Sequence, residues 1–268
     1  MSSILPALGN PFRTNRLTWW LVALFLSTAA TLHATVVTFN WPSPPGWTAG
    51  SPTPGQTKTQ VFTSFYPNDL TVAINNSGAA AQGVVWQAGY PQISANPLTG
   101  GLTGVNGLQL YAASSKVVGS YIETTVSFLT PVINLSFQIW DVDQGAGAFI
   151  DKISNIQALT DLGATVGAAS VTSAVPGYNS ITGTGLSTVV VGTAAASGTT
   201  NQGTIDITFN GPITQFSFRW SNNDPALGAQ AIALGQIIYT PVPEPEYFSI
   251  AGLLCLAAIG LEVRKRRT

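Results

Sequence analysis

Three aspartates between residues 141 and 151 are the side chains whose type and spacing best suit chemistry. Asp141 and Asp143 follow a strand-like segment that ends near Trp140, and Asp151 comes back after the Gly-containing stretch 144–148. Carboxylates two residues apart, joined by a third through a loop, offer the oxygen ligands of Ca²⁺, which takes about six to eight of them. The segment lacks the other ligand positions and the terminal Glu of an EF-hand loop. Asp141, Asp143 and Asp151 are therefore candidate Ca²⁺ ligands.

A second interpretation gives the same aspartates a structural role, because aspartates at strand ends accept backbone hydrogen bonds or cap turns. Ile133 to Ile139 alternates apolar and polar residues. Continuing this alternation would bury Asp141 and Asp143 beside Ile139, where unpaired charges cost several kcal/mol. We therefore expect the strand to end, bulge or reach the rim of the fold near Trp140. The segment from Asn222 to Pro225 either reaches the same rim or is only a turn.

Enzyme chemistry is restricted by the positions of two residues. His33 and Cys255 are the only histidine and the only cysteine, and both lie in terminal segments. Residues 35–240 therefore cannot assemble a Ser-His-Asp triad, a Cys-His pair, or a zinc site that uses these ligands. We expect no enzymatic activity. Glycoside hydrolysis by two carboxylates about 5 to 10 Å apart remains as an alternative.

The charge of the central region argues against nucleic acid as a partner. Residues 35–240 carry four basic and eight acidic side chains, a net charge of −4. Phosphate backbones require clustered Lys and Arg. Since Cys255 lies outside this region, the region forms no internal disulfide, and its length suffices for a core that holds without one.

The central region is predicted to be built of strands. Short segments with period-two alternation or β-branched and aromatic residues are bounded by Gly, Pro, Asn or Asp. They comprise residues 35–40, 59–65, 70–74, 107–112, 117–129, 133–139, 152–160, 164–171, 205–210, 215–220 and 231–240. About ten short strands without helical periodicity predict an all-β fold, an antiparallel β-sandwich or jelly roll. The turn signal Asn210-Gly211-Pro212 predicts a hairpin between the strands on either side of it.

Two stretches, 75–106 and 176–200, are either long loops or weak strands. The Pro-rich segment from Trp41 to Pro54 is expected to be extended and to pack its tryptophans on the fold. Aromatic residues in or beside the predicted loops could stack on sugars or simply fill the core. These residues are Trp47, Tyr66, Trp86, Tyr90 and Tyr178.

The N-terminus has the features of a secretory signal peptide. Arg13 and Arg16 precede the apolar run 17–26, and small residues follow it. Cleavage after Ala30 or Ala34 fits this pattern, so residues 1–34 are predicted to be a signal peptide. An uncleaved anchor is the alternative.

The C-terminus is predicted to be a single membrane helix. Residues 247–261 are uncharged and rich in Leu and Ile, and Arg264, Lys265, Arg266 and Arg267 follow. With its flanks, at about 247–263, this run approaches the roughly 20 residues that cross a bilayer. Basic residues favour the cytoplasmic side, so the region before Pro241 is expected outside.

Directly before this run stand Pro243, Glu244 and Pro245. The motif, the short apolar run and the basic end together resemble the PEP-CTERM sorting tail of Gram-negative bacteria, over residues 241–268. Glu246 and Glu262 depart from the commonest form of that tail. The sequence Asp-x-Asp, followed by Asp151-Lys152-Ile153, is loosely similar to β-sandwich ectodomains of such proteins.

This resemblance implies export, transient retention in the inner membrane, processing by an exosortase-type enzyme, and delivery to the cell surface or an exopolysaccharide matrix. We therefore expect an exported protein with a structural or adhesive role. A carbohydrate-binding or Ca²⁺-dependent lectin-like module is the alternative.

Overall fold

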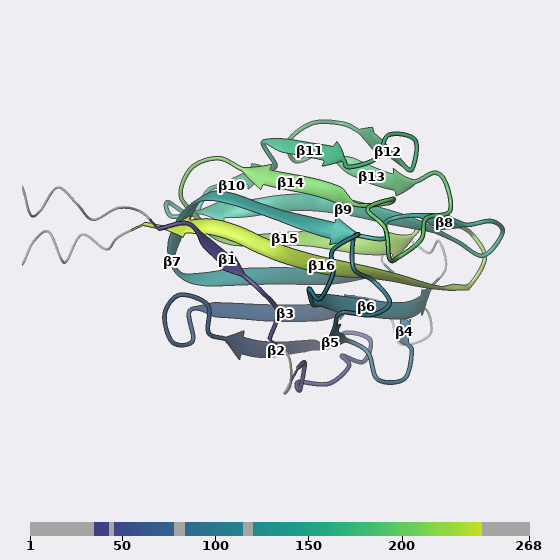
Figure 1. Ribbon diagram of the computed structural model, residues 1–268, viewed down its shortest axis with the longest axis horizontal. Coiled ribbons are helices and arrows are strands. Elements are labelled where there is room, and N and C mark those ends of the chain that lie inside the picture. Colours follow the sequence, from purple (N-terminus) through teal and green to yellow (C-terminus); the bar gives the residue numbers. More distant parts are fainter. Residues whose placement is uncertain (1–34, 43–45, 78–83, 115–119, 243–268) are drawn as a thin grey trace, which may run out of the picture. The chain divides into compact units, whose positions relative to one another are not determined.

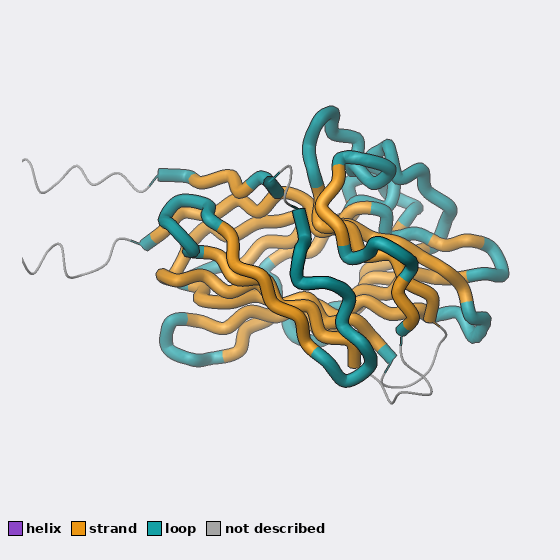
Figure 2. The backbone as a smooth tube through the Cα atoms, turned by 90° about the horizontal axis from the view of Figure 1, so that it is seen from below, coloured by secondary structure: helices purple, strands orange, loops and turns teal. Residues whose placement is uncertain are grey.

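The computed structural model describes residues 35–42, 46–77, 84–114 and 120–242. Residues 35–242 form one compact unit. The described residues contain strands and loops and no helix, as the colours of Figure 2 show. All strand pairs are antiparallel. The predicted signal peptide, the sorting motif and the basic end lie outside the described residues.

The strands are β1 (Val37–Phe39), β2 (Thr57–Phe62), β3 (Leu70–Ser77), β4 (Val85–Trp86), β5 (Gln92–Ser94), β6 (Gly107–Ser114), β7 (Tyr121–Trp140), β8 (Gln144–Gly145), β9 (Phe149–Thr160), β10 (Thr165–Gly167), β11 (Ser170–Ser173), β12 (Asn179–Thr182), β13 (Val189–Gly192), β14 (Ile205–Phe209), β15 (Ile213–Asn222) and β16 (Gly228–Pro241). The prediction of an all-β antiparallel fold is confirmed.

The strands form two layers that share β7. The first half of β7 pairs with β3 and β15, and the series continues from β3 to β2 and from β15 through β9 and β13 to β12. The second half of β7 pairs with β14 and β16, and the series continues to β11 on one side and to β6 and β1 on the other. In Figure 1, β16 of the second layer lies in front of β15 of the first.

A change of side-chain parity in β7 marks the passage from one layer to the other. Buried positions are even-numbered from Ile122 to Val132 and odd-numbered from Leu135 to Ile139. Between them Asn134 has a positive φ of 54°. Such an irregularity shifts the alternation by one residue, as a β-bulge does. The two strands predicted at 117–129 and 133–139 are therefore one strand that bends.

The predicted hairpin around Gly211 is wrong. The strands β14 and β15 do not pair with each other; both pair with β7, β14 through residues 135–139 and β15 mainly through residues 122–127. The Asn210-Gly211-Pro212 segment is thus a corner at which the chain changes layer. Gly211, with φ of 83°, supplies the left-handed conformation that this corner uses.

Aromatic rings fill the space between the layers. Phe137 stacks on Phe216 at 4.1 Å between ring centroids, and it also contacts Phe209 and Phe218. Phe137 and Phe209 come from the second layer, and Phe216 and Phe218 from the first. The apolar faces predicted from period-two alternation therefore meet across a common core.

The less regular segments contain short strands at the edges of this body. The stretch 75–106 contributes β4 and β5, and the stretch 176–200 contributes β12 and β13. Trp41 belongs to the Pro-rich segment that precedes these stretches in the sequence. It is buried, and its Nε1 donates to the carbonyl of Gly235 at 2.7 Å. The expectation that this segment packs its tryptophans on the fold is confirmed for Trp41 and Trp47.

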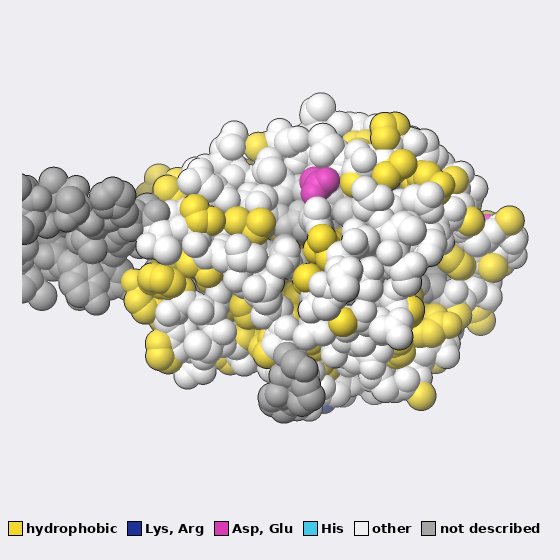
Figure 3. Space-filling view, viewed as in Figure 1, with side chains coloured by type: hydrophobic (Ala, Val, Ile, Leu, Met, Phe, Trp, Pro, Cys, Tyr) yellow, Lys and Arg dark blue, Asp and Glu magenta, His cyan; other side chains and the backbone are white. Residues whose placement is uncertain are grey.

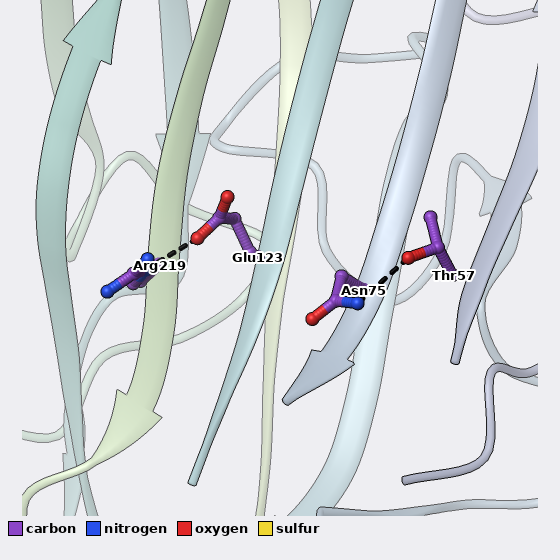
Figure 4. Close-up of polar contacts among 4 residues, drawn as sticks. All are labelled: Thr57, Asn75, Glu123 and Arg219. Carbon is purple, nitrogen blue, oxygen red and sulfur yellow. Dashed lines mark hydrogen bonds and ion pairs between the residues drawn. The ribbon is translucent and has the colours of Figure 1, made fainter. Parts of the chain in front are cut away.

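Two polar cross-strand contacts lie on the outer face of the first layer (Figure 4). Arg219 of β15 pairs with Glu123 of β7, and its guanidinium lies 4.2 Å from the centroid of the Tyr121 ring. Asn75 of β3 donates to Thr57 Oγ1 of β2 at 2.8 Å. Such exposed pairs typically contribute about 0 to 1 kcal/mol each, so the core dominates stability.

Candidate functional site

The aspartate cluster lies where β7 ends and β9 begins. Strand β7 ends at Trp140, one of the three outcomes expected near this residue, and Asp141 follows with a positive φ of 65°. The short β8–β9 hairpin then brings Asp151 back, and its backbone N–H donates to the carbonyl of Asp143 at 2.9 Å. The three aspartates are therefore neighbours, as their spacing suggested.

Asp151 is fully buried and bonded on both oxygens. Its Oδ1 accepts from Trp220 Nε1 at 2.7 Å, and its Oδ2 accepts from the backbone N–H of Asp143 at 3.2 Å. The amide of Gln230, oriented to satisfy its neighbours, also donates to Oδ1 at 3.1 Å and accepts from Ser114 Oγ. Asp151 is thus the centre of a buried polar network.

Asn222 extends this network to the next turn. Its Nδ2 donates to the carbonyl of Ser114 at 2.7 Å, and its Oδ1 accepts from the backbone N–H groups of Ile150 and Asp224. The segment from Asn222 to Pro225 therefore reaches the cluster, one of the two predicted outcomes. Trp220, Gln230 and Ser114 were missed, because nothing in their local sequence indicates what they contact.

Asp143 connects the cluster to the loop 193–204. Its Oδ2 accepts from the backbone N–H of Ala196 at 2.8 Å. This loop also meets the loop 95–106, where Thr99 N–H donates to the carbonyl of Gly198 at 2.7 Å. The two stretches that sequence patterns left unresolved thus come together beside the aspartates.

Asp141 is the incompletely bonded member. Its Oδ1 is buried and has no hydrogen-bond partner. Burial, and then the charge of Asp143, raises the pKa of Asp141 from 3.8 to about 7. Burial also raises the pKa of Asp143, and raises that of Asp151 further, although hydrogen bonds from Ala196 and Trp220 act in the opposite direction. These carboxyls therefore hold a proton over much of the acidic pH range.

The arrangement fits Ca²⁺ poorly. Asp143 and Asp151 are 7% and 0% exposed, and protein N–H groups already occupy three of their four oxygens. In the part of the chain that the structure describes, no three Asp, Glu, His or Cys side chains are grouped to hold one ion. The geometry favours the other interpretation, in which the aspartates accept hydrogen bonds at a strand end.

The burial of Asp143 and Asp151 also limits their access to a substrate. The neighbouring carboxyls of Asp143 and Asp151 are enclosed, so they do not face a substrate-accessible cleft. A shallow depression of about 80 Å³ lies between β9, β10 and β15, lined by residues such as Gln157, Thr165 and Gln215. Ligand pockets usually measure about 300 to 1,000 Å³.

The aromatic candidates for sugar stacking have mostly structural contacts. Trp47 and Trp86 are half-buried, and their indole N–H groups donate to the carbonyls of Gly50 and Pro52. Tyr90 packs edge-on against Tyr111 at 5.2 Å. Tyr178 is half-buried, and Tyr66 is 41% exposed.

Among the described residues no helix is long and apolar enough to cross a membrane. The segment for which a span is predicted, about 247–263, lies outside the described residues, as do Pro243, Glu244, Pro245 and the basic residues 264–267.

The described residues define an all-β antiparallel protein with a buried acidic cluster. Neither a protein-family model, nor a curated protein, nor a solved structure matches the chain.

Proposed function

We propose that the chain is an exported protein of a Gram-negative cell envelope or exopolysaccharide matrix, sorted through its C-terminal tail, with a non-catalytic structural or adhesive domain. We infer that this domain is a β-sandwich of the jelly-roll kind, since two antiparallel layers face each other across an aromatic core. The inner membrane holds the precursor, and an exosortase-type enzyme processes it.

The main support for the proposal is the point at which the folded domain ends. Strand β16 ends at Pro241, and Val242 N–H donates to the carbonyl of Pro131 at 2.9 Å, which is the last described backbone bond. The motif Pro243-Glu244-Pro245 follows directly. A processing enzyme would thus find its motif in the sequence immediately after the last strand of the folded body.

A structural role also agrees with the hydrogen bonding of the buried carboxyls and with the burial of the tryptophans. Asp69, Asp143 and Asp151 accept hydrogen bonds from backbone or side-chain donors, and the five described tryptophans are buried or half-buried. The lectin-like alternative, with the exopolysaccharide as partner, would use the exposed rings of Tyr66 and Phe65 instead. Binding of the purified domain on a glycan array distinguishes the two.

The sorting proposal is tested in the producing cells. Replacing Pro243, Glu244 and Pro245 together by alanine is expected to leave the protein in the inner-membrane fraction. Glu246→Ala is the matched control, because it removes a neighbouring carboxylate outside the motif, and it should leave delivery intact. Surface delivery of the triple-alanine variant at the wild-type level would refute the proposed role of the motif.

A further inference from the structure

One end of the folded body, which we call the exit end, contains the first and last residues of that body, Thr35 and Val242, and four turns. Val37 pairs with Tyr239, so Thr35 and Val242 lie close together there. The bend of β7 at 129–134 contacts them through the bond between Val242 and Pro131. The loop 63–69, the turn 161–164 and the corner 210–212 are joined to this bend by register pairs and backbone bonds. In Figure 1 the start of β1 and the end of β16 lie on the same side of the body.

Exposed apolar side chains concentrate at the exit end. Of the ten large apolar side chains that are exposed in the described residues, five lie here: Val36, Phe65, Tyr66, Leu129 and Leu162. Leu162 is 90% exposed and Leu129 is 69% exposed. In Figure 3 hydrophobic side chains are visible at this end of the body, and others lie at the opposite end. A concentration of this kind marks an interaction surface rather than the ordinary scatter of apolar residues.

The aromatic pair of this surface is held outward by a buried carboxylate. Asp69 is 6% exposed and accepts hydrogen bonds from the backbone N–H groups of Ser64, Phe65 and Tyr66, at 2.7 to 2.8 Å. Tyr239 also donates to Ser64 Oγ at 2.8 Å. The rings of Phe65 and Tyr66 then pack edge to face at 4.6 Å. The loop is fixed in a form that presents both rings to the outside.

The exit end carries little charge. Its described segments contain Asp161, which is exposed, and Asp69, which is engaged, and they contain neither Lys nor Arg. An apolar, nearly uncharged surface that includes a Tyr suits the interfacial region of a bilayer, where Tyr and Trp are enriched.

The sequence that follows the described residues indicates that this surface faces lipid. Residues 247–261 are the uncharged run predicted to span the membrane, and only four residues separate Val242 from Tyr247. At about 3.5 Å per residue these span at most about 17 Å, so an anchored tail keeps the exit end beside the lipid surface. The opposite end is far away, because β9, from Phe149 to Thr160, runs about 36 Å between the two ends.

We propose that the exit end of the domain docks on the outer surface of the lipid bilayer through Phe65, Tyr66, Leu129 and Leu162 while the tail is anchored. This docking rests on the proposed membrane span of the tail. It fixes the orientation of the precursor, with the acidic cluster and the loops 193–204 and 223–227 directed away from the membrane. Because the contact is apolar, it is insensitive to salt.

The test uses the full chain in phosphatidylcholine vesicles that contain a nitroxide-labelled lipid. A single environment-sensitive fluorophore is placed by Leu162→Cys or Leu129→Cys in a Cys255→Ser background. Leu227→Cys is the matched control, because Leu227 is 72% exposed and lies in the β15–β16 turn at the opposite end. The proposal predicts several-fold stronger quenching at residues 162 and 129 than at residue 227, at low and at high salt. Equal quenching at all three positions would overturn it.

A label on the natural Cys255 tests the membrane anchor separately from the docking of the exit end. A fluorophore on Cys255 reports directly on whether the tail enters the bilayer. Quenching there, without quenching at residues 162 and 129, refutes docking and leaves the anchor intact; no quenching at any position refutes both. As a second variant, Leu162→Asp is expected to reduce quenching at residue 129, whereas Leu227→Asp leaves it unchanged.

Discussion

The carboxyl of Asp141 should make the domain less stable at neutral pH than at acidic pH. Burial and Asp143 raise its pKa from 3.8 to about 7. A carboxyl with a higher pKa in the folded state binds its proton more tightly there. Its contribution to stability is therefore complete below pH of about 3.8 and is lost as the pH rises through about 7.

The size of the effect follows from the two pKa values. They differ by about 3, and each pKa unit corresponds to about 1.4 kcal/mol, which gives about 4 kcal/mol. This is an upper figure, because water that enters the neighbouring loops would solvate the ionised form. Domains are stable by about 5 to 15 kcal/mol, so the effect is a large fraction of the total.

Asp141→Asn provides the perturbation. Asparagine has the shape of the protonated carboxyl, cannot ionise, and tolerates the positive φ at this position. We expect the variant to match the wild type near pH 4 and to exceed its stability near pH 7.5 by up to about 4 kcal/mol. Some pH dependence should remain, because the pKa values of Asp143 and Asp151 are raised too.

Urea unfolding of residues 35–242 at pH 4 to 8, followed by tryptophan fluorescence, measures these free energies. Asp161→Asn is the control, since Asp161 is exposed, and its curve should follow that of the wild type. A wild-type stability that does not fall between pH 4 and 7.5, or one that falls equally in Asp141→Asn, would show that the carboxyl is not buried as described.

Two further outcomes are expected. Gly235→Ala should destabilise the domain by about 1 to 3 kcal/mol in thermal unfolding, because its Cβ would lie 2.5 Å from the Trp140 ring; if the same change costs as much in a Trp140→Leu background, steric conflict with the indole is not the cause. Calorimetric titration with Ca²⁺ should give no binding heat, since the oxygens of Asp143 and Asp151 are engaged; a heat that disappears in Asp141→Asn/Asp143→Asn would show that the loops rearrange into a Ca²⁺ site.

Local sequence patterns were sufficient to predict which side chains are buried where a strand has one buried face. The alternation in 133–139 correctly predicts that Leu135, Phe137 and Ile139 enter the core, although Ile133 is only half-buried. The same parity predicts that the strand ends, bulges or reaches the rim near Trp140, and it ends there. Both predictions depend only on the two-residue period of a strand and on the cost of burying a charge.

Pairing between strands could not be predicted in this way. The segment around Gly211 has the composition of a hairpin turn, yet its flanking strands lie in different layers. A turn residue specifies a local backbone conformation, whereas the choice between a hairpin and a corner depends on which strand edge each segment meets. Here both segments meet β7, which is distant in sequence.

The sequence by itself determined the all-β class and indicated a break in β7 near Trp140, because both depend on residues adjacent along the chain; the sorting tail stays a prediction. The tertiary structure alone decided the environment of the aspartates. Trp220, Gln230 and Ala196 come from distant segments and occupy the oxygens that spacing had offered to a metal. It also decided that Phe65, Leu129 and Leu162 lie at the same end of the body as Val242, since long-range packing sets which loops become neighbours.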